Sequence, residues 1–383
     1  MKYRRLGKTD LTVSEIGFGG EWLERHPEED SVALMRYAHK KGINIVDCWM
    51  PDPKSRDIIG KAIAEDPGGW YVQGHIGSTW QNGQYTRTRD VQKCRAAFED
   101  LLRRLGTGRV ELGMIHYVDR ESDWETVSRP GPYLDYVTEL KALGKIGHIG
   151  LSTHNPVIAQ KAAESGFIEM ILFSVNPAFD LMPPTDVIEN YFADHYAKEL
   201  KGVDPVRAEM YRLCESLDVG ITCMKPFAGG RLFDAKRSPF GIALTPVQCV
   251  HYCLTRPGVA SVLCGYDTLD QIDAAAAYET ADEVEKDYAT ALAKAPRHSF
   301  AGGECTYCGH CRPCPKDIDI AMVSKLYDLA VMQPEVPVSI REHYLALEHH
   351  AGECVACGGC EGRCPFGVKV SDRMKNAEEL FGE

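Results

Sequence analysis

Hydrophobic and polar positions follow a repeating pattern from residue 10 to about residue 280. Each short apolar run is followed by an amphipathic stretch, such as TRDVQKCRAAFEDLLRRLG, which ends at Gly106 as a helix C-cap should. The apolar runs predict strands at residues 12–19, 43–49, 70–77, 110–118, 145–152, 170–176, 220–227 and 259–266. Eight βα units predict an α/β fold of the (β/α)8 TIM-barrel type. An open doubly wound sheet is the alternative, which the lack of a G-x-G-x-x-G motif after a strand weakens.

Two further segments suggest how the chain is divided. The connection at 177–204 is long, and it is either a functional loop of the barrel or an insertion that only packs on it. A polar helical pattern covers residues 281–295, and residues 296–304 resemble a linker. We therefore expect a barrel over residues 1–295 and a smaller, mainly helical module over residues 296–383.

The cysteines change the picture at the C-terminal end. Eight of the 15 cysteines in this 383-residue chain lie between Cys305 and Cys364, in two sets of four. The second set repeats the first 49 residues later, or 50 residues later for the last member. The sets are Cys305, Cys308, Cys311, Cys314 and Cys354, Cys357, Cys360, Cys364. In a reducing compartment such short spacings indicate metal or redox chemistry rather than disulfides.

The cysteine spacing is typical of a two-cluster ferredoxin. C-x2-C-x2-C lets one loop supply three thiolates to a [4Fe–4S] cluster, and the following C-P supplies the fourth ligand of the other cluster. We expect Cys364 to complete the first cluster and Cys314 to complete the second. Two structural zinc sites are the alternative, although zinc ligands usually come as separated C-x2-C pairs. The sequence therefore predicts two [4Fe–4S] clusters in the module.

Charge and hydropathy exclude several classes of partner. The net charge of −12 disfavours nucleic acid and acidic membranes. No apolar run of 18 residues exists, and the opening MKYRRLGKTD lacks the apolar core of a signal peptide. We expect a cytoplasmic protein that meets a small-molecule substrate and a redox partner such as a ferredoxin.

Polar residues stand at the carboxyl ends of three consecutive predicted strands. They are Asp47, His75 and His116. In a TIM barrel these strand ends form the active face. Each residue alone is more readily explained as structural, but three on consecutive strands indicate a site.

Three motifs then carry a resemblance. MKYRRLGKTDLTVSEIGFGG, GHIGLSTHNP and CMKPFAGGRL resemble the opening segment, the fifth-strand motif and the seventh-strand loop of the aldo/keto reductase family. With its cysteine tail, the chain resembles the branch of that family that has a C-terminal ferredoxin-like module. The resemblance implies a TIM barrel, NADPH as the hydride source, and an active-site tetrad of Asp, Tyr, Lys and His.

Only half of that tetrad is retained. Asp47 and His116 stand at the family's Asp and His, whereas Asp52 stands at its Tyr and His75 at its Lys. Histidine titrates near neutral pH, so we expect His75 and His116 to act as acid–base or substrate-polarising groups. Asp47 and Asp52 would orient or tune them. A turn residue in the PDP segment is an equally good interpretation of Asp52.

Other residues near these strands have simpler interpretations. Cys48 follows Asp47 in its strand and should face the opposite way, which indicates packing rather than a nucleophile. The early tryptophans either line a pocket or pack: Trp22, Trp49 and Trp80. Four cysteines in apolar runs are expected in the core: Cys223, Cys249, Cys253 and Cys264.

The loops after the last two strands of a barrel commonly bind phosphate. Here Gly229 and Gly230 expose backbone N–H groups, Arg231 adds a positive charge, and Gly265 ends the last predicted strand. A plain turn with a solvated arginine is the alternative. In the resemblance, Ser152 corresponds to the residue that holds the nicotinamide amide.

The adenosine side of this nucleotide site is altered. Ala274 and Ala275 stand where the family has a Glu–Asn pair, although Gln271 remains. NADPH and a flavin mononucleotide, which lacks adenosine, therefore both stay open as further cofactors.

These features predict an iron–sulfur oxidoreductase that reduces a carbonyl or a related unsaturated small molecule. Electrons would pass through two [4Fe–4S] clusters to an active site with an altered tetrad, in an anaerobic setting. One alternative is an NADPH-dependent aldo/keto reductase whose clusters are structural or regulatory. The other is a non-catalytic electron-transfer or redox-sensing protein.

Overall fold

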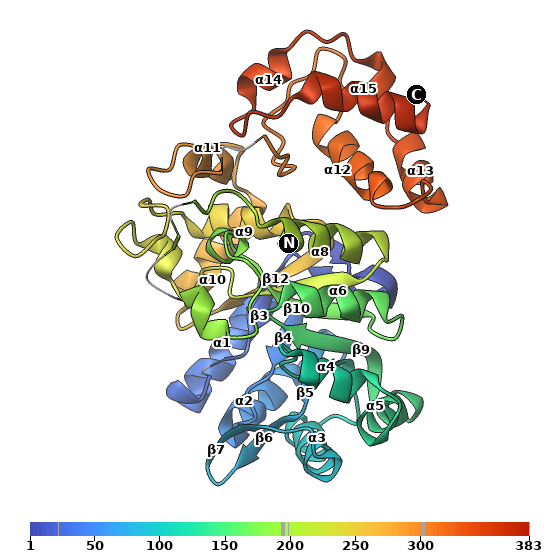
Figure 1. Ribbon diagram of the computed structural model, residues 1–383. Coiled ribbons are helices and arrows are strands. Elements are labelled where there is room, and N and C mark those ends of the chain that lie inside the picture. The colour runs from blue at the N-terminus through green and yellow to red at the C-terminus, as the bar shows by residue number, and fades with distance from the viewer. Residues whose placement is uncertain (22, 193–195, 198, 301–302, 383) are drawn as a thin grey trace.

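The computed structural model describes the chain except for residues 22, 193–195, 198, 301–302 and 383. Its parallel strands close into a barrel that helices surround (Figure 1). In their order around the barrel the strands are β3 (Ile16–Gly19), β4 (Ile45–Cys48), β5 (Tyr71–Ile76), β8 (Val110–Ile115), β9 (Ile146–Thr153), β10 (Met170–Ser174), β11 (Gly220–Met224) and β12 (Val259–Gly265). The TIM-barrel prediction is confirmed, and the open-sheet alternative is wrong because β12 pairs with β3.

An antiparallel hairpin precedes the barrel. It consists of β1 (Tyr3–Arg5) and β2 (Thr12–Ser14). Residues 12–14, which we expected to begin the first barrel strand, belong to this hairpin instead. The apolar run misleads here because Leu6 and Val13 are fully buried and pack with side chains from inside the barrel.

A second hairpin follows β5 and was not expected. It consists of β6 (Ser78–Gln81) and β7 (Gln84–Arg87). Asn82 and Gly83 connect the two strands with φ angles of 53° and 76°. Both angles lie in the left-handed region, as a two-residue hairpin turn of type I′ requires.

Helices follow the barrel strands. They are α1 (Glu28–Lys40), α2 (Pro53–Ile63), α3 (Val91–Leu105), α4 (Glu121–Ser128), α5 (Pro132–Ala142), α6 (Pro156–Glu164), α7 (Pro177–Asp180), α8 (Pro205–Ser216), α9 (Pro246–Leu254), α10 (Leu269–Ala276) and α11 (Tyr288–Ala293). Short 3-10 helices are η1 (Gly7–Thr9), η2 (Leu23–Arg25), η3 (Ile188–Phe192), η4 (Arg231–Phe233), η5 (Ala277–Glu279) and η6 (Ala351–Glu353). Gly106 ends α3 as predicted, with a φ of 67°. Within the described residues, no helix is long and apolar enough to cross a membrane.

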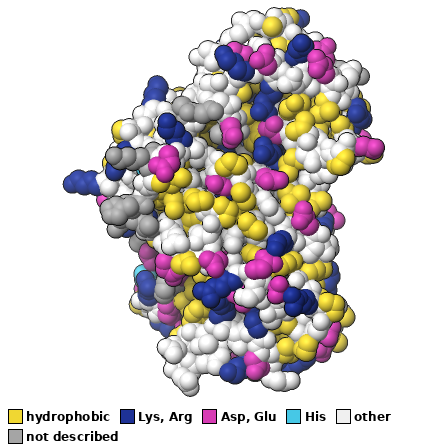
Figure 2. All heavy atoms as spheres, in the orientation of Figure 1, with side chains coloured by type: hydrophobic (Ala, Val, Ile, Leu, Met, Phe, Trp, Pro, Cys, Tyr) yellow, Lys and Arg dark blue, Asp and Glu magenta, His cyan; other side chains and the backbone are white. Residues whose placement is uncertain are grey.

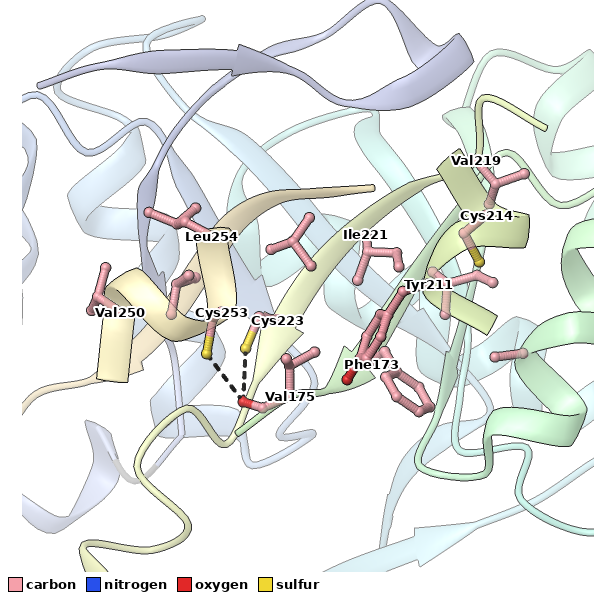
Figure 3. Close-up of a cluster of buried hydrophobic side chains, with 14 of the residues drawn as sticks. Phe173, Val175, Tyr211, Cys214, Val219, Ile221, Cys223, Val250, Cys253 and Leu254 are labelled. Atoms are coloured by element: carbon pink, nitrogen blue, oxygen red, sulfur yellow. Dashed lines mark hydrogen bonds between the residues drawn. The ribbon is translucent and has the colours of Figure 1, made fainter. Parts of the chain in front are cut away.

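The four cysteines predicted for the core are fully buried there. Figure 3 shows two of them, Cys223 on β11 and Cys253 on α9, with both thiols directed at one carbonyl oxygen. Each donates a weak hydrogen bond to the Val175 oxygen, at 3.3 and 3.2 Å. Burial raises the pKa of the Cys223 thiol well above its usual value, so this thiol stays protonated and acts as a packing residue.

The C-terminal module consists of α12 (Ile320–Val331), α13 (Val338–Leu345), α14 (Gly359–Arg363) and α15 (Val370–Phe381). It lies against the outer surface of the barrel, with α12 beside α8 (Figure 1). Contacts that connect the parts include an ion pair, with Lys325 Nζ 2.6 Å from Glu215 Oε1, and a hydrogen bond that Arg256 Nη2 donates to the Thr306 oxygen at 2.8 Å. The module therefore touches the helical wall of the barrel.

Candidate functional site

A cavity of about 710 Å³ opens at the carboxyl ends of the barrel strands. We call it the barrel pocket. Strand ends contribute Gly19, Asp47, His75, His116, Ser152 and Met224 to its lining. Loops and the β6–β7 hairpin contribute Trp49, Tyr85, Tyr117, His154, Phe192 and Lys225. The three polar residues predicted from consecutive strand ends thus share one cavity.

Four side chains of the barrel pocket form one hydrogen-bonded row. His75 Nε2 lies 2.8 Å from Asp47 Oδ1, and His75 Nδ1 lies 2.8 Å from His116 Nδ1. His116 Nε2 lies 2.8 Å from the Tyr85 hydroxyl. We call Asp47, His75, His116 and Tyr85 the proton row, since it joins a buried carboxylate to a phenol in the pocket lining.

The barrel itself holds the inner end of the proton row. Asp47 on β4 is the register partner of Gln73 on β5, two residues before His75. Gln73 Nε2 donates to Asp47 Oδ1 at 2.9 Å, and Thr222 Oγ1 donates to Gln73 Oε1 at 2.8 Å. Asp47 is only 5% exposed, so these hydrogen bonds fix the direction of its carboxylate.

His116 lies in an environment that keeps it neutral. Burial lowers the pKa of His116 well below its usual value, and the neighbouring His75 and Arg89 lower the pKa further. Trp49 stacks on the His116 ring with centroids 5.9 Å apart, while Tyr85 meets the Trp49 ring edge-on. These aromatic contacts hold the imidazole between Trp49 and the phenol.

Tyr85 is the residue of the proton row that sequence reasoning missed. It lies on β7, and burial raises the pKa of its phenol. The signal was present, because Asn82–Gly83 between alternating residues is a strong hairpin motif. The hairpin thus supplies a phenol that the position of Asp52 does not.

Two further pocket residues were also missed, His154 and Lys225. The His154 imidazole pairs with the buried Asp119 carboxylate, at 2.9 Å from Nδ1 to Oδ2. Lys225 lies close enough to Glu21 to lower its pKa, although burial has the larger effect and the pKa of Glu21 is raised overall. The pocket therefore carries a positive charge as well as the proton row.

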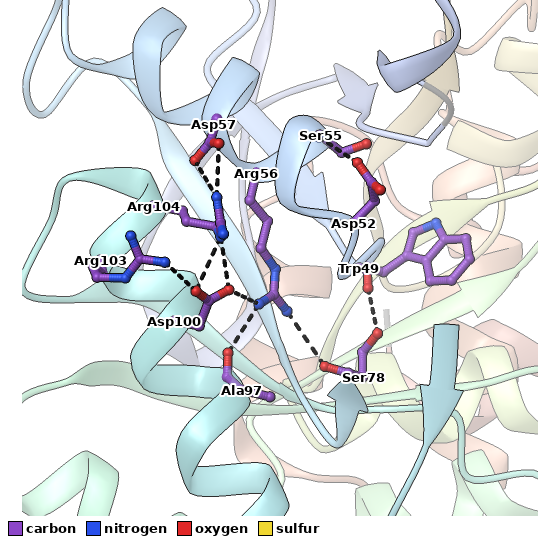
Figure 4. Close-up of polar contacts among 10 residues, drawn as sticks. All are labelled: Trp49, Asp52, Ser55, Arg56, Asp57, Ser78, Ala97, Asp100, Arg103 and Arg104. Atoms are coloured by element: carbon purple, nitrogen blue, oxygen red, sulfur yellow. Dashed lines mark hydrogen bonds and ion pairs between the residues drawn. The ribbon is translucent and has the colours of Figure 1, made fainter. Parts of the chain in front are cut away.

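The structure places Asp52 at the start of a helix. Its carboxylate caps α2 by accepting a hydrogen bond from the Ser55 N–H at 3.1 Å, and it does not belong to the pocket lining (Figure 4). Arg56, in the same helix, is buried and donates to the Ser78 oxygen at 3.4 Å. The Ser78 hydroxyl in turn donates to the Trp49 oxygen at 2.6 Å. These hydrogen bonds hold the first strand of the β6–β7 hairpin against α2 and the end of β4.

The other residues near the early strands differ in position. Cys48 is fully buried, and burial raises the pKa of its thiol to about 12, which agrees with packing rather than nucleophilic chemistry. Trp49 lines the barrel pocket, whereas the 36% exposed Trp80 does not. Trp22 lies outside the described residues.

Most of the predicted nucleotide residues line the barrel pocket. Gly229 and Gly230 have φ angles of 65° and 79°, which suit glycine and expose the backbone of this loop. Ser152 and Gly265 also contribute to the lining. The pocket therefore continues from the proton row to the loops after β11 and β12.

Arg231 and the alanines bear on the far end of the nucleotide site. Arg231 is only 7% exposed, its guanidinium lies 5.9 Å from the centre of the Tyr196 ring, and it is not one of the residues that line the pocket. Ala274 and Ala275 on α10 do line the pocket. An adenosine placed there would therefore meet methyl groups at these two positions.

The eight tail cysteines line two hollows in the module. Cys305, Cys308, Cys311 and Cys364 line the first hollow. Cys314, Cys354, Cys357 and Cys360 line the second hollow. Each hollow thus takes three sulfurs from one cysteine set and the fourth from the other, which is the ligand pattern of a two-cluster ferredoxin.

The four thiols around each hollow are the donor set that a [4Fe–4S] cluster requires.

Two known protein families match this chain, one over the barrel and one over the cysteine-rich module. The model of the aldo/keto reductase family matches residues 15–245, and the model of the 4Fe-4S dicluster domain matches residues 303–369. The protein is thus an oxidoreductase with a TIM barrel and an iron–sulfur domain. Since the first match spans more than half of the sequence, the chain belongs to the aldo/keto reductase family.

Individual relatives match the barrel part. The uncharacterized oxidoreductase YqkF of Bacillus subtilis is 25% identical over 288 residues, which is 71% of this chain and 89% of YqkF. L-galactose dehydrogenase of Arabidopsis thaliana is 24% identical, over 71% of this chain and 86% of its own. The solved structure of aldo-keto reductase AKR11C1 from Bacillus halodurans shares the fold, with a TM-score of 0.57 and 22% sequence identity. The match covers 75% of this chain and 94% of AKR11C1.

Proposed function

We propose that this protein reduces a carbonyl group of a small molecule in the barrel pocket and that the module, with two [4Fe–4S] clusters, supplies the electrons. The observation that carries the proposal is the proton row, which ends with Tyr85 in the pocket lining. Reduction of a carbonyl to an alcohol by one-electron donors takes two electrons, one from each cluster, and two protons, one for the oxygen and one, drawn from water, for the carbon. A phenol hydrogen-bonded in series to two imidazoles and a carboxylate is suited to deliver the proton to the oxygen.

The proton row works in this proposal by reversing its hydrogen bonds. With an extra proton on His75 beside Asp47, His75 Nδ1–H donates to His116, and His116 Nε2–H donates to the Tyr85 oxygen. The Tyr85 O–H then donates to the substrate oxygen. After Tyr85 has passed its proton on, it takes one from His116, and His116 takes one from His75.

The stored proton belongs at the inner end of the row. The pKa of His116 lies well below its usual value, so a positive charge is disfavoured on His116. His75 Nε2, in contrast, lies 2.8 Å from the Asp47 carboxylate. The proposal therefore places the spare proton at this inner end of the row and its release at Tyr85.

Electrons from the module must cross the wall of the barrel. When bound, [4Fe–4S] clusters supply electrons one at a time. Among the described residues, none from 296–383 lines the barrel pocket. Arg256, which donates to the Thr306 oxygen next to Cys305, lies over the Tyr252 ring at 4.5 Å. The Tyr252 hydroxyl donates to Asp180 Oδ2 at 2.7 Å.

This buried chain of contacts continues to the barrel pocket. Phe179 adjoins Asp180 in sequence, and its ring packs edge-on against the Phe192 ring with centroids 5.1 Å apart. Phe192 lines the pocket. A continuous path through bonded and packed groups therefore joins the first cysteine hollow to the proposed reaction site.

NADPH is the second candidate source of electrons, because the barrel pocket extends past Gly229 and Gly230 to Gly265 and α10. Barrels commonly bind phosphate with these loops. When bound, NADPH would supply a hydride to the carbonyl carbon, while the proton row would supply the proton. The clusters would then be structural or regulatory.

The test is anaerobic turnover by the full chain with its clusters, against a panel of small aldehydes and ketones. We expect alcohol formation with reduced ferredoxin. Tyr85→Phe should lose turnover while its clusters still take up electrons, and Tyr71→Phe, at the amino end of β5, is the matched control. Turnover with NADPH as the sole donor would establish the second candidate. Failure of both donors would reject both candidates and leave the electron-transfer or redox-sensing alternative.

A further inference from the structure

A second cavity, of about 310 Å³, lies where the module meets the barrel. Its walls are α8 with the residues before it, the turn after α9, and the chain that begins the first cysteine hollow. We call it the junction cavity. Figure 2 shows both basic and acidic side chains along the junction between the upper module and the barrel below.

Positive charge predominates in the junction cavity. Lys201, Arg212, Arg256 and Arg373 line it, against the acids Glu304 and Asp328. The Asp328 carboxylate is already occupied, because Arg373 Nη1 donates to Oδ1 and the Tyr307 hydroxyl donates to Oδ2 at 2.7 Å. The Asp328 carboxylate is therefore paired with Arg373, and among the described residues no hydrogen bond joins it to Arg212 or Arg256.

Two of the arginines have hydrogen-bond donors to spare. The Arg256 side chain is 5% exposed, and its Nη2 donates to the Thr306 oxygen and to the Tyr288 hydroxyl. Its Nε has no acceptor in the part of the chain that the structure describes, and neither does the buried Arg212 Nε. A buried cationic N–H without an acceptor is costly, so both groups favour an anion.

We propose that the junction cavity binds a small oxyanion, a carboxylate or a phosphate group. The volume suits a small ligand, and guanidinium groups match the planar or tetrahedral oxygens of both anions. The binding site is distinct from the barrel pocket, since the two linings share no residue.

An anion bound in the junction cavity would lie next to the first cysteine hollow and would affect the reduction potential of a cluster there. Cys305, a predicted ligand of the first cluster, lies in the cavity wall. A negative charge beside a cluster makes the addition of an electron less favourable. A bound oxyanion would therefore lower the reduction potential of one cluster and regulate its supply of electrons.

The binding test uses calorimetric titration of the full chain, loaded with clusters, with malonate and with inorganic phosphate. We expect one saturable site for at least one anion, and the tighter anion identifies the ligand group. Arg212→Gln should weaken binding about tenfold or more. Arg129→Gln, at the exposed end of α4, should bind like the wild type. Arg212→Lys, which keeps the charge but loses the planar fork, should fall between them.

The second measurement is a spectroelectrochemical titration of the same proteins with and without the tighter anion. We expect the anion to lower the potential of one cluster in the wild type and in Arg129→Gln, but not in Arg212→Gln. Two results would overturn the proposal: no saturable binding of either anion, or binding that Arg212→Gln leaves unchanged. An equal change of potential by Arg212→Gln with and without anion would also overturn it, because Arg212 would then only balance the cluster charge. Neither measurement involves turnover, so the proposed function can fail independently.

Discussion

His75 and His116 face each other through their Nδ1 atoms, which lie 2.8 Å apart. Only one of these two nitrogens can carry the hydrogen in that bond, so a proton on one ring dictates the tautomer of the other. Because the opposite nitrogens contact Asp47 and Tyr85, the state of the carboxylate is linked to the state of the phenol.

Removal of the Tyr85 hydroxyl tests this link. We expect Tyr85→Phe to lower kcat by about 10²–10⁴-fold, as loss of a general acid does, because the ring still packs on Trp49. Steady-state kinetics with a saturating electron donor measures the effect, with Tyr71→Phe as the control. An unchanged kcat would remove Tyr85 from the reaction.

The protonation of His116 provides a prediction on pH. Burial and the neighbouring His75 lower the pKa of His116, so its ring should stay neutral as the pH falls from 7 through 6.5 and should protonate only well below that value. NMR titration of histidine ring signals measures this. In His75→Asn one of the lowering causes is absent, and the His116 transition should move to higher pH. A transition near pH 6.5 in the wild type would show that burial does not disfavour the charged form of His116.

Pairs of substitutions can test whether each cluster takes three cysteines from one set and its fourth cysteine from the other set. In Cys305→Ser/Cys364→Ser both changes fall in the first hollow, so we expect one cluster, with about four irons per chain, to survive. In Cys305→Ser/Cys314→Ser each hollow loses a sulfur, and both clusters should be weakened. Iron analysis and electron paramagnetic resonance distinguish the two variants. The reverse result would show that each repeat binds its own cluster.

The buried carboxylate of Asp180 should be important for stability. It is fully buried and accepts hydrogen bonds from Arg207, Tyr211 and Tyr252. Asp180→Asn leaves the Arg207 charge without a counter-ion, so we expect a loss of about 3–5 kcal/mol in the free energy of unfolding. Tyr211→Phe should cost only about 1–2 kcal/mol. Denaturant unfolding under anaerobic conditions measures both, and equal losses would argue against an unpaired charge.

Substitution of Asp52 tests whether this residue has a structural or a catalytic role. As the N-cap of α2 it should contribute about 1 kcal/mol to stability. We expect Asp52→Ala to lower the melting temperature slightly and to leave kcat unchanged, since Asp52 lies outside the pocket lining. A strong loss of kcat at normal stability would return Asp52 to the active site.

The barrel was predictable because its signals are local and repeated. Each parallel strand is an apolar run, and helix ends such as Gly106 have the expected left-handed backbone. Residues 12–14 were misassigned since Val13 is as buried as a strand residue, although it belongs to a hairpin at the end of the barrel. An apolar pattern reports burial, but it does not report which neighbour buries the side chain.

The candidate site was predictable only in part. Asp47, His75 and His116 could be found because strand ends share one face of a barrel. Tyr85 could not be placed without the β6–β7 hairpin, whose fold over the pocket depends on contacts such as that between Ser78 and Trp49. The junction cavity was beyond reach for a similar reason, because it forms only when Arg256 meets Thr306 across the two parts of the chain.

The exchange of one cysteine between the repeats has a consequence for how the module can change over time. A gene duplication normally yields two copies, either of which can be lost. Here, deletion of either repeat would leave no hollow with four sulfurs, because Cys314 and Cys364 each serve the opposite repeat. With one cluster in each hollow, as we propose, the two halves are retained or lost together, and a descendant of this chain with a single intact cluster would have to rebuild a ligand elsewhere.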